Sequence, residues 1–219
     1  MTNWTVAPPP KRQPAGNPVF EPLSAGTMLY RVHGDYPAHE FNPMPQPSRL
    51  VGGRFDSLDG AYAYTYLGDT GQTAIAETLC RDLPRAGAAR LVPRVKVRGK
   101  KLSTVEVTRD LTVLVLHGAA LTHVGATLAL TKSDADQYHA TRAWAVALRR
   151  WFPGVDGFRY RPRHDEDHVV WVLFDDGLDA GQGRAHGALR TVGSVELLDH
   201  EPGETMVRKV LHLYNATLS

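Results

Sequence analysis

Short apolar runs separated by glycine- and proline-rich turns dominate the hydrophobic pattern of this 219-residue chain. Their length and alternation are typical of strands. The predicted strands are 27–32, 61–67, 91–97, 102–107, 111–116, 157–161, 168–174 and 191–198. Apolar residues recur at helical spacing over about 72–82, 134–151 and 204–215. Because the strands come in runs rather than alternating with helices, the pattern predicts an α+β fold with a mixed β core and flanking helices.

The length of the chain predicts one domain. Residues 1–22 hold six prolines and little apolar periodicity, so we expect an extended arm that is partly disordered or draped over the surface. Residues 23–219 are then expected to form the single domain.

The amino-acid composition is typical of a soluble globular protein and gives little support to nucleic-acid binding. Hydrophobic residues make up 42% and charged residues 22%, as in soluble globular proteins. A formal net charge of +2 gives little support to direct nucleic-acid binding through residues 94–101. That segment surrounds an expected turn at Gly99 with basic side chains, which are either a solvated hairpin tip or a phosphate-contacting patch. These side chains are Lys96, Arg98, Lys100 and Lys101.

The lone cysteine and the lack of long apolar runs in the sequence bear on where in the cell the protein is expected. Cys80 excludes an intramolecular disulfide, and its place on the apolar side of a predicted helix favours an inert, buried thiol. No apolar run approaches the eighteen or so residues of a membrane span. The N-terminus lacks the apolar core of a signal peptide. We therefore expect a cytoplasmic protein without a membrane partner.

The segment 52–79, GGRFDSLDGAYAYTYLGDTGQTAIAETL, combines an arginine, an aromatic strand and one acid. The guanidinium of Arg54 suits a diphosphate, and the preceding glycines allow a ligand to approach the backbone. Tyr66 either stacks on a flat ring, donates its hydroxyl or packs in the core. Glu77 either faces solvent or points into a cleft, where its charge would stabilise a sugar cation. Arg31, inside an apolar strand, either faces solvent or a carboxylate, or adds a second cation to that cleft.

Several other kinds of site lack support. The chain has no GxGxxG fingerprint, no GxxxxGK[ST] loop and no GxSxG elbow. The stretch HDEDH at 164–168 has zinc-like histidine spacing, but it lies between two predicted strands rather than on a helix. A surface loop, or a loop at the edge of the cleft, is the favoured interpretation, and no metal site is expected.

Four segments in order resemble the RES domain family, named for arginine, glutamate and serine. They are LYRV at 29–32, GGRF at 52–55, YLGDTGQTAIAETL at 66–79 and DGFRYRPRHD at 156–165 followed by VVWVLF. The resemblance implies a fold similar to ADP-ribosyltransferases and an activity on NAD. Family members are bacterial toxins that consume NAD by hydrolysis or phosphorolysis, or transfer ADP-ribose to a target. An Xre-type helix-turn-helix antitoxin usually neutralises them.

Carried onto this chain, the resemblance implies roles for particular residues. The expected catalytic residues are Glu77, Arg54 and Tyr66. The expected NAD-binding residues are Tyr30, Arg31, Arg54, Tyr66 and His164. NAD is the substrate, the acceptor is water, inorganic phosphate or a protein, and pyridinium leaves without help from a metal. The sequence leaves open whether the chain forms a homo-oligomer.

One position departs from the family pattern. The family serine falls at Pro162, which has neither a hydroxyl nor a backbone N–H. This departure favours a second hypothesis, a module that binds a nucleotide or an antitoxin without turnover. The candidate substitutes for the serine are the neighbouring residues Arg161, Arg163 and His164, and the alternative is an altered site.

Overall fold

The computed structural model describes residues 4–48, 51–84, 89–176, 185 and 187–219. One eight-stranded sheet has the order β1-β6-β7-β8-β3-β2-β5-β9. Its strands are β1 (Phe20–Leu23), β2 (Met28–His33), β3 (Ala63–Gly68), β5 (Lys101–Val107), β6 (Leu111–Val115), β7 (Gly157–Tyr160), β8 (Val170–Asp175) and β9 (Leu189–Leu197). Only β6 and β7 pair in parallel within this sheet. A separate parallel pair joins β4 (Leu91–Val92) to β10 (Thr217–Leu218).

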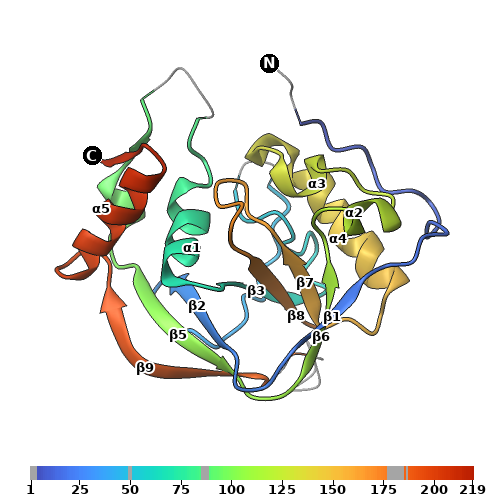
Figure 1. Cartoon of the computed structure of the whole chain (residues 1–219), viewed down its shortest axis with the longest axis horizontal. Helices are drawn as coiled ribbons and strands as arrows, with labels where there is room; N and C mark the ends of the chain where they lie inside the picture. Colours follow the sequence, from blue (N-terminus) through green and yellow to red (C-terminus); the bar gives the residue numbers. More distant parts are fainter. Residues whose placement is uncertain (1–3, 49–50, 85–88, 177–184, 186) are drawn as a thin grey trace.

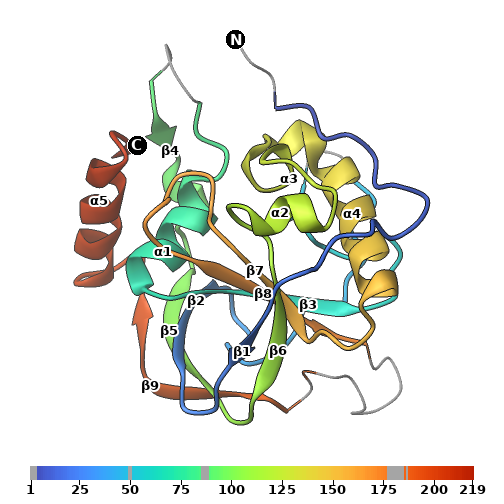
Figure 2. The same cartoon turned by 45° about the vertical axis from the view of Figure 1, so that its right-hand side comes forward.

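Helices cover one side of the curved sheet in two groups (Figures 1 and 2). One group is α1 (Gly71–Ile75) and α5 (Gly203–Leu213), and the other is α2 (Ala120–His123), α3 (Ala129–Lys132) and α4 (Tyr138–Trp151). The α+β prediction is confirmed by this mixed sheet with flanking helices. Within the described ranges, no helix is long and apolar enough to cross a membrane.

Three clusters of buried side chains hold these layers together, and the strand alternation explains their division. On β3, Tyr64 joins the cluster beneath α4, whereas Leu67 points to the opposite face of the sheet. A third cluster packs Ile75 and Leu79 against Val207 of α5. Each helix group therefore has its own core.

The N-terminal segment is tied to the domain. The indole Nε1 of Trp144 donates to the Ala7 carbonyl over 2.7 Å, so the segment lies along α4 (Figure 2). It then enters the sheet as β1, which pairs with β6. The expected arm at 1–22 therefore ends in a strand, which its prolines and weak alternation concealed.

Other boundaries also differ from the prediction. The expected strand at 91–97 is wrong, because only Leu91–Val92 is extended and a 3-10 turn follows over Arg94–Lys96. Pro93 separates the two parts and cannot donate to a ladder. The one-turn helices α2 and α3 were not predicted, since four residues carry too little periodicity. The expected loop at 175–190 lies largely outside the described residues.

The neighbouring strands of the sheet that pair over the fewest residues are β2 and β3. Strand β3 pairs with β8 along its whole length, and β2 pairs in the same way with β5. Between β2 and β3, by contrast, the only register pair is Tyr30 with Gly68. The two strands therefore diverge, and a cleft opens beside them.

Candidate active site

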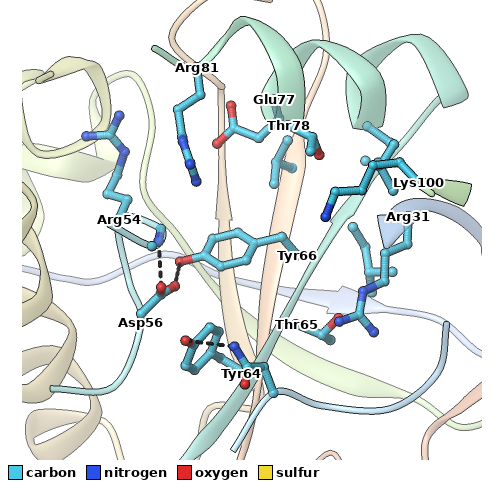
Figure 3. A pocket seen from close by; sticks show the side chains of 18 of the residues that line it. Arg31, Arg54, Asp56, Tyr64, Thr65, Tyr66, Glu77, Thr78, Arg81 and Lys100 are labelled. Carbon is cyan, nitrogen blue, oxygen red and sulfur yellow. Dashed lines mark hydrogen bonds between the residues drawn. The ribbon is translucent and has the colours of Figure 1, made fainter. Parts of the chain in front are cut away.

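A cleft of about 280 Å³ lies where β2 and β3 diverge. Its walls include the turn before β3, the first helical segment after β3 and the residue that precedes β5 (Figure 3). Four of the predicted site residues line it, namely Arg31, Arg54, Tyr66 and Glu77. Segments far apart in the sequence thus come together in one place.

The turn at Gly52–Gly53 needs both glycines. Gly52 has φ +94°, a conformation that residues with a Cβ rarely adopt. At Gly53, an added Cβ would lie 2.6 Å from Oδ1 of Asp56 and 2.7 Å from the hydroxyl of Tyr66. The glycines therefore allow a close approach of this turn to side chains of the cleft, rather than to a ligand alone.

Helix α4 fixes this turn through Arg142, a fully buried side chain that the sequence analysis missed. Its guanidinium donates to the carbonyls of Gln46, Ser48, Val51 and Gly53. A buried arginine can donate to several backbone carbonyls at once. It therefore holds in place an irregular segment whose carbonyls do not pair in a strand ladder.

The preceding residue of α4 adds to this anchoring. Thr141 donates its hydroxyl to the carbonyl of Arg54 over 2.6 Å. The backbone of Arg54 is therefore fixed by α4 before any ligand binds.

The guanidinium of Arg54 is only 3% exposed and is largely used by the protein. It donates to Oγ of Ser133 over 2.8 Å, to the Ser133 carbonyl over 3.1 Å and to the Leu130 carbonyl over 3.2 Å. It also lies over the ring of Tyr138, 5.1 Å from the centroid. Within the described chain its Nε has no partner, so one donor remains.

Tyr66 uses both functions of its hydroxyl inside the protein. It donates to Oδ1 of Asp56 over 2.8 Å (Figure 3). It also accepts from the backbone N–H of Phe55 over 2.8 Å. Burial raises the pKa of Tyr66 well above its ordinary value, and the neighbouring Asp56 charge raises it further. The hydroxyl is therefore a neutral structural group, and the ring is what Tyr66 presents to the cleft.

Asp56 is the second site residue that the sequence analysis missed. Burial raises the pKa of its carboxyl, while hydrogen bonds from the Gly53 N–H and from Tyr66 lower it. The residue stands two positions after Arg54, and a polar side chain directly after GGRF was the available signal.

Glu77 lies in a π-helical turn over Ala76–Cys80 that continues α1. Such turns are rare and occur often at functional sites. Thr70 caps the N-terminus of α1, because its side chain accepts a hydrogen bond from the Thr73 N–H. The half-buried Glu77 side chain points into the cleft (Figure 3).

The carboxylate of Glu77 accepts a hydrogen bond from the hydroxyl of Tyr160 over 2.8 Å. Burial raises the pKa of Glu77, and the charge of Arg54 and this hydrogen bond act in the opposite direction. Tyr160 was also missed, although the alternation of GFRYR places Phe158 and Tyr160 on one face of β7. The hydroxyl of Tyr160 therefore orients the carboxylate of Glu77, the acid that faces the cleft from the π-helical turn.

Arg31 and Arg81 add cations to the walls. NH1 of Arg31 donates to the carbonyls of Ala38 and Glu40, and burial lowers the pKa of this arginine. Nε of Arg81 lies 3.3 Å from Oδ1 of Asp82. Arg31 is therefore held by backbone carbonyls, whereas Arg81, among the described residues, is held through its Nε alone.

Two of the predicted site residues do not line this cleft. Tyr30 packs against the cluster formed by α1, α5 and their strands. His164 lines a second hollow, together with Trp4, Leu128 and Lys132. Its place beside Pro162 in the sequence does not bring it into the cleft with Glu77.

At the position of the family serine, the backbone takes part in a contact. Nζ of Lys132 donates to the carbonyls of Pro162 and Arg161 over 2.6 and 3.0 Å. The proline itself is absent from the lining of the cleft that holds Glu77. Cys80 is buried, and burial raises the pKa of its thiol to about 12, as expected for an inert cysteine. Within the described part of the chain, no three His, Cys, Asp or Glu side chains could hold a metal ion.

Comparison with known proteins adds two findings. A model of the RES domain matches residues 28–192, most of this chain. Among solved structures, the chain is similar to one in the crystal structure of the M. tuberculosis MbcT–MbcA toxin–antitoxin complex. The identity is 21% and the TM-score 0.55, over 86% of this chain and 91% of that chain, a likeness of fold. No curated protein matches the chain.

Proposed function

The chain belongs to the RES domain family, and on this basis we propose that it is an NAD-degrading enzyme that cleaves the bond between nicotinamide and ribose. The observation that carries the proposal is Glu77. A carboxylate oriented by Tyr160 faces the cleft that also holds the ring of Tyr66. An acid, an aromatic face and surrounding cations suit a ligand that combines a ribose, a flat ring and a diphosphate.

The proposed chemistry needs charge stabilisation more than proton transfer. As nicotinamide leaves with the bonding electrons, positive charge develops on the ribose, as in glycoside hydrolysis. Ionised Glu77 stabilises that charge inside a low-dielectric cleft. The Arg54 charge and the Tyr160 hydrogen bond favour the ionised form of Glu77 against its burial. The ring of Tyr66 provides a face on which nicotinamide stacks.

The acceptor then completes the reaction. Attack by water gives ADP-ribose and a proton, whereas attack by inorganic phosphate gives a phosphorylated ADP-ribose. Transfer to a protein side chain is the remaining acceptor class. We propose a small acceptor, because the chemistry requires only an attacking oxygen at the ribose carbon beside Glu77.

The test is to incubate the purified chain with NAD and to follow free nicotinamide by chromatography, with and without phosphate. We expect release by the native chain and loss of release in Glu77→Gln. Product mass distinguishes water from phosphate. Intact NAD after incubation with the native chain, or equal release by Glu77→Gln, would contradict the proposed reaction.

Binding without turnover is the second candidate, and Pro162 is the observation that favours it. A non-catalytic module would raise its melting temperature with NAD and leave NAD intact. The same incubation, monitored by both readouts, separates the two candidates.

We further propose that the chain is the toxin of a toxin–antitoxin pair acting in the cytoplasm. Its similarity of fold to a chain of the MbcT–MbcA toxin–antitoxin complex supports this proposal. The proposed antitoxin is an Xre-type helix-turn-helix protein. Expression of the chain should arrest growth, and co-expression of a small helix-turn-helix protein encoded beside it should restore growth. Growth unaffected by the chain would argue against the toxin.

A further inference from the structure

The cations around the cleft differ in how much of their hydrogen-bonding capacity is free. Arg31 and Arg54 donate to backbone carbonyls, and Arg81 lies beside Asp82. The half-buried Lys100 also lines the cleft. Throughout the described residues, its ammonium has no hydrogen-bond or ion-pair partner. All of its donors are therefore free to meet a ligand, whereas Arg31, Arg54 and Arg81 each use at least one donor within the protein.

The turn before β5 explains why Lys100 faces inwards. Gly99 has φ +65° and open space around it, so the chain reverses there at little cost. The backbone N–H of Lys100 donates to the Val97 carbonyl over 2.9 Å, and its carbonyl accepts from the Leu198 N–H over 2.9 Å. The backbone is thus held on both sides while the side chain stays free.

Strand alternation then separates two adjacent lysines. Lys101 opens β5 opposite His33, and its ammonium lies 2.7 Å from Oδ1 of Asp35. Lys100 points the other way, and Figure 3 shows its ammonium directed into the cleft, on the side of Tyr66 away from Asp56. Of the basic residues of this turn, Lys100 is the one that lines the cleft.

We propose that Lys100 binds a phosphate oxygen of the dinucleotide, an inference that rests on the proposed function. An ammonium on a flexible stem brings three donors to one anionic oxygen. With a flat ring on Tyr66 and the ribose beside Glu77, the diphosphate lies toward Lys100. Arg31 and Arg54 then contribute positive potential and hold the walls, and Lys100 makes the direct ionic contact.

Matched variants test this assignment. Lys100→Met keeps the apolar stem and removes the charge, Lys101→Met removes one charge from the neighbouring exposed ion pair, and Lys100→Arg restores a cation. The affinity for ADP-ribose is measured by calorimetry for each chain, and the KM for NAD wherever turnover is detected. Adenosine, which lacks phosphate, serves as the ligand control. Melting temperatures report whether each variant folds.

Loss of a charge-assisted hydrogen bond should weaken ADP-ribose binding by Lys100→Met about tenfold or more. The affinity of Lys100→Met for adenosine, which lacks phosphate, should change little. Lys101→Met should bind ADP-ribose within about twofold of the native chain, because exposed ion pairs contribute little. Lys100→Arg should recover most of the loss.

The outcomes separate the two proposals. If the native chain binds ADP-ribose and Lys100→Met binds it equally, the Lys100 assignment is overturned and the proposed function stands. An equal loss in Lys101→Met would also overturn the assignment, because it would show a general charge effect. If the native chain neither binds ADP-ribose nor cleaves NAD, both proposals fall.

Discussion

Tyr160 on β7 donates its hydroxyl to Oε1 of Glu77 over 2.8 Å, which joins a strand at one side of the cleft to the π-helical turn above it. The hydrogen bond favours the ionised carboxylate, because it lowers the pKa of Glu77. Burial, the larger effect, raises that pKa. The balance between burial and the hydrogen bond from Tyr160 helps to set the pH at which Glu77 becomes negatively charged.

Removal of this hydrogen bond should therefore shift the pH dependence of NAD cleavage. In Tyr160→Phe the pKa of Glu77 rises further, so activity should fall at a higher pH on the acidic side than in the native chain. The measurement is kcat/KM against pH. Tyr30→Phe, a tyrosine outside the cleft, is the control and should leave the acidic limb in place. An unshifted limb in Tyr160→Phe would show that Glu77 does not govern it.

Neutralising Glu77 should stabilise the fold while it abolishes cleavage. The folded-state pKa of Glu77 is raised, so the folded chain keeps a proton that the unfolded chain loses as pH rises above about 4. Stability is therefore lost as pH rises through the folded-state pKa, and Glu77→Gln avoids that loss.

The melting temperature of Glu77→Gln should accordingly exceed that of the native chain at neutral pH. The difference should vanish below about pH 4, where both states of the native chain are protonated. Thermal melts at several pH values check this. A lower melting temperature for the variant at neutral pH would mean that the protein compensates the buried charge fully.

Tyr66→Phe should separate the two functions of this side chain. The change leaves Asp56 and the Phe55 N–H without their partner, which should cost about 1–3 kcal/mol of unfolding free energy. The ring remains, so nicotinamide release should persist. Tyr66→Leu removes the ring as well and should lose most of the activity. Denaturant titrations and initial rates measure the two effects, and equal rates for the two variants would exclude stacking on Tyr66.

Arg142→Met should unfold or loosen the segment before β3. Four carbonyls lose a charged donor, so we expect a loss of about 3 kcal/mol or more in unfolding free energy. Arg142→Lys should rescue little, because an ammonium cannot reproduce the planar fork. Arg150→Met, at an exposed position of the same helix, is the control. A change below about 0.5 kcal/mol in Arg142→Met would contradict the anchoring role.

The sequence predicted the fold class because the signal for strands is local. The alternation around Tyr62, Tyr64 and Tyr66 and the long periodicity of α4 can be read from neighbouring residues alone. The strand expected at 91–97 was wrong because its apolar residues resemble a strand, whereas Pro93 and the contact with β10 decide the backbone. Short elements such as α3 are specified by packing rather than by pattern.

The same contrast between local sequence signals and distant contacts separates the site residues that were predicted from those that were missed. The order of motifs singled out Arg54, Tyr66 and Glu77, which share the cleft. Asp56, Tyr160 and Arg142 were missed, since each is defined by a partner that is ten or more residues away. Tyr30 and His164 adjoin motif residues in sequence, but strand alternation and the course of the chain take them elsewhere.

The divergence of β2 and β3 at the single Tyr30–Gly68 pair divides the residues around the cleft between two halves of the sheet. Arg31 and Lys100 belong to the half built from β2, β5 and β9, whereas Tyr66 and Tyr160 belong to the half built from β3, β8 and β7. Substitutions in one half leave the ladders of the other intact. Under the proposed function, the anion contact and the carboxylate could therefore be engineered separately, since a library confined to the turn before β5 would leave the half of the sheet that carries Tyr160 unchanged.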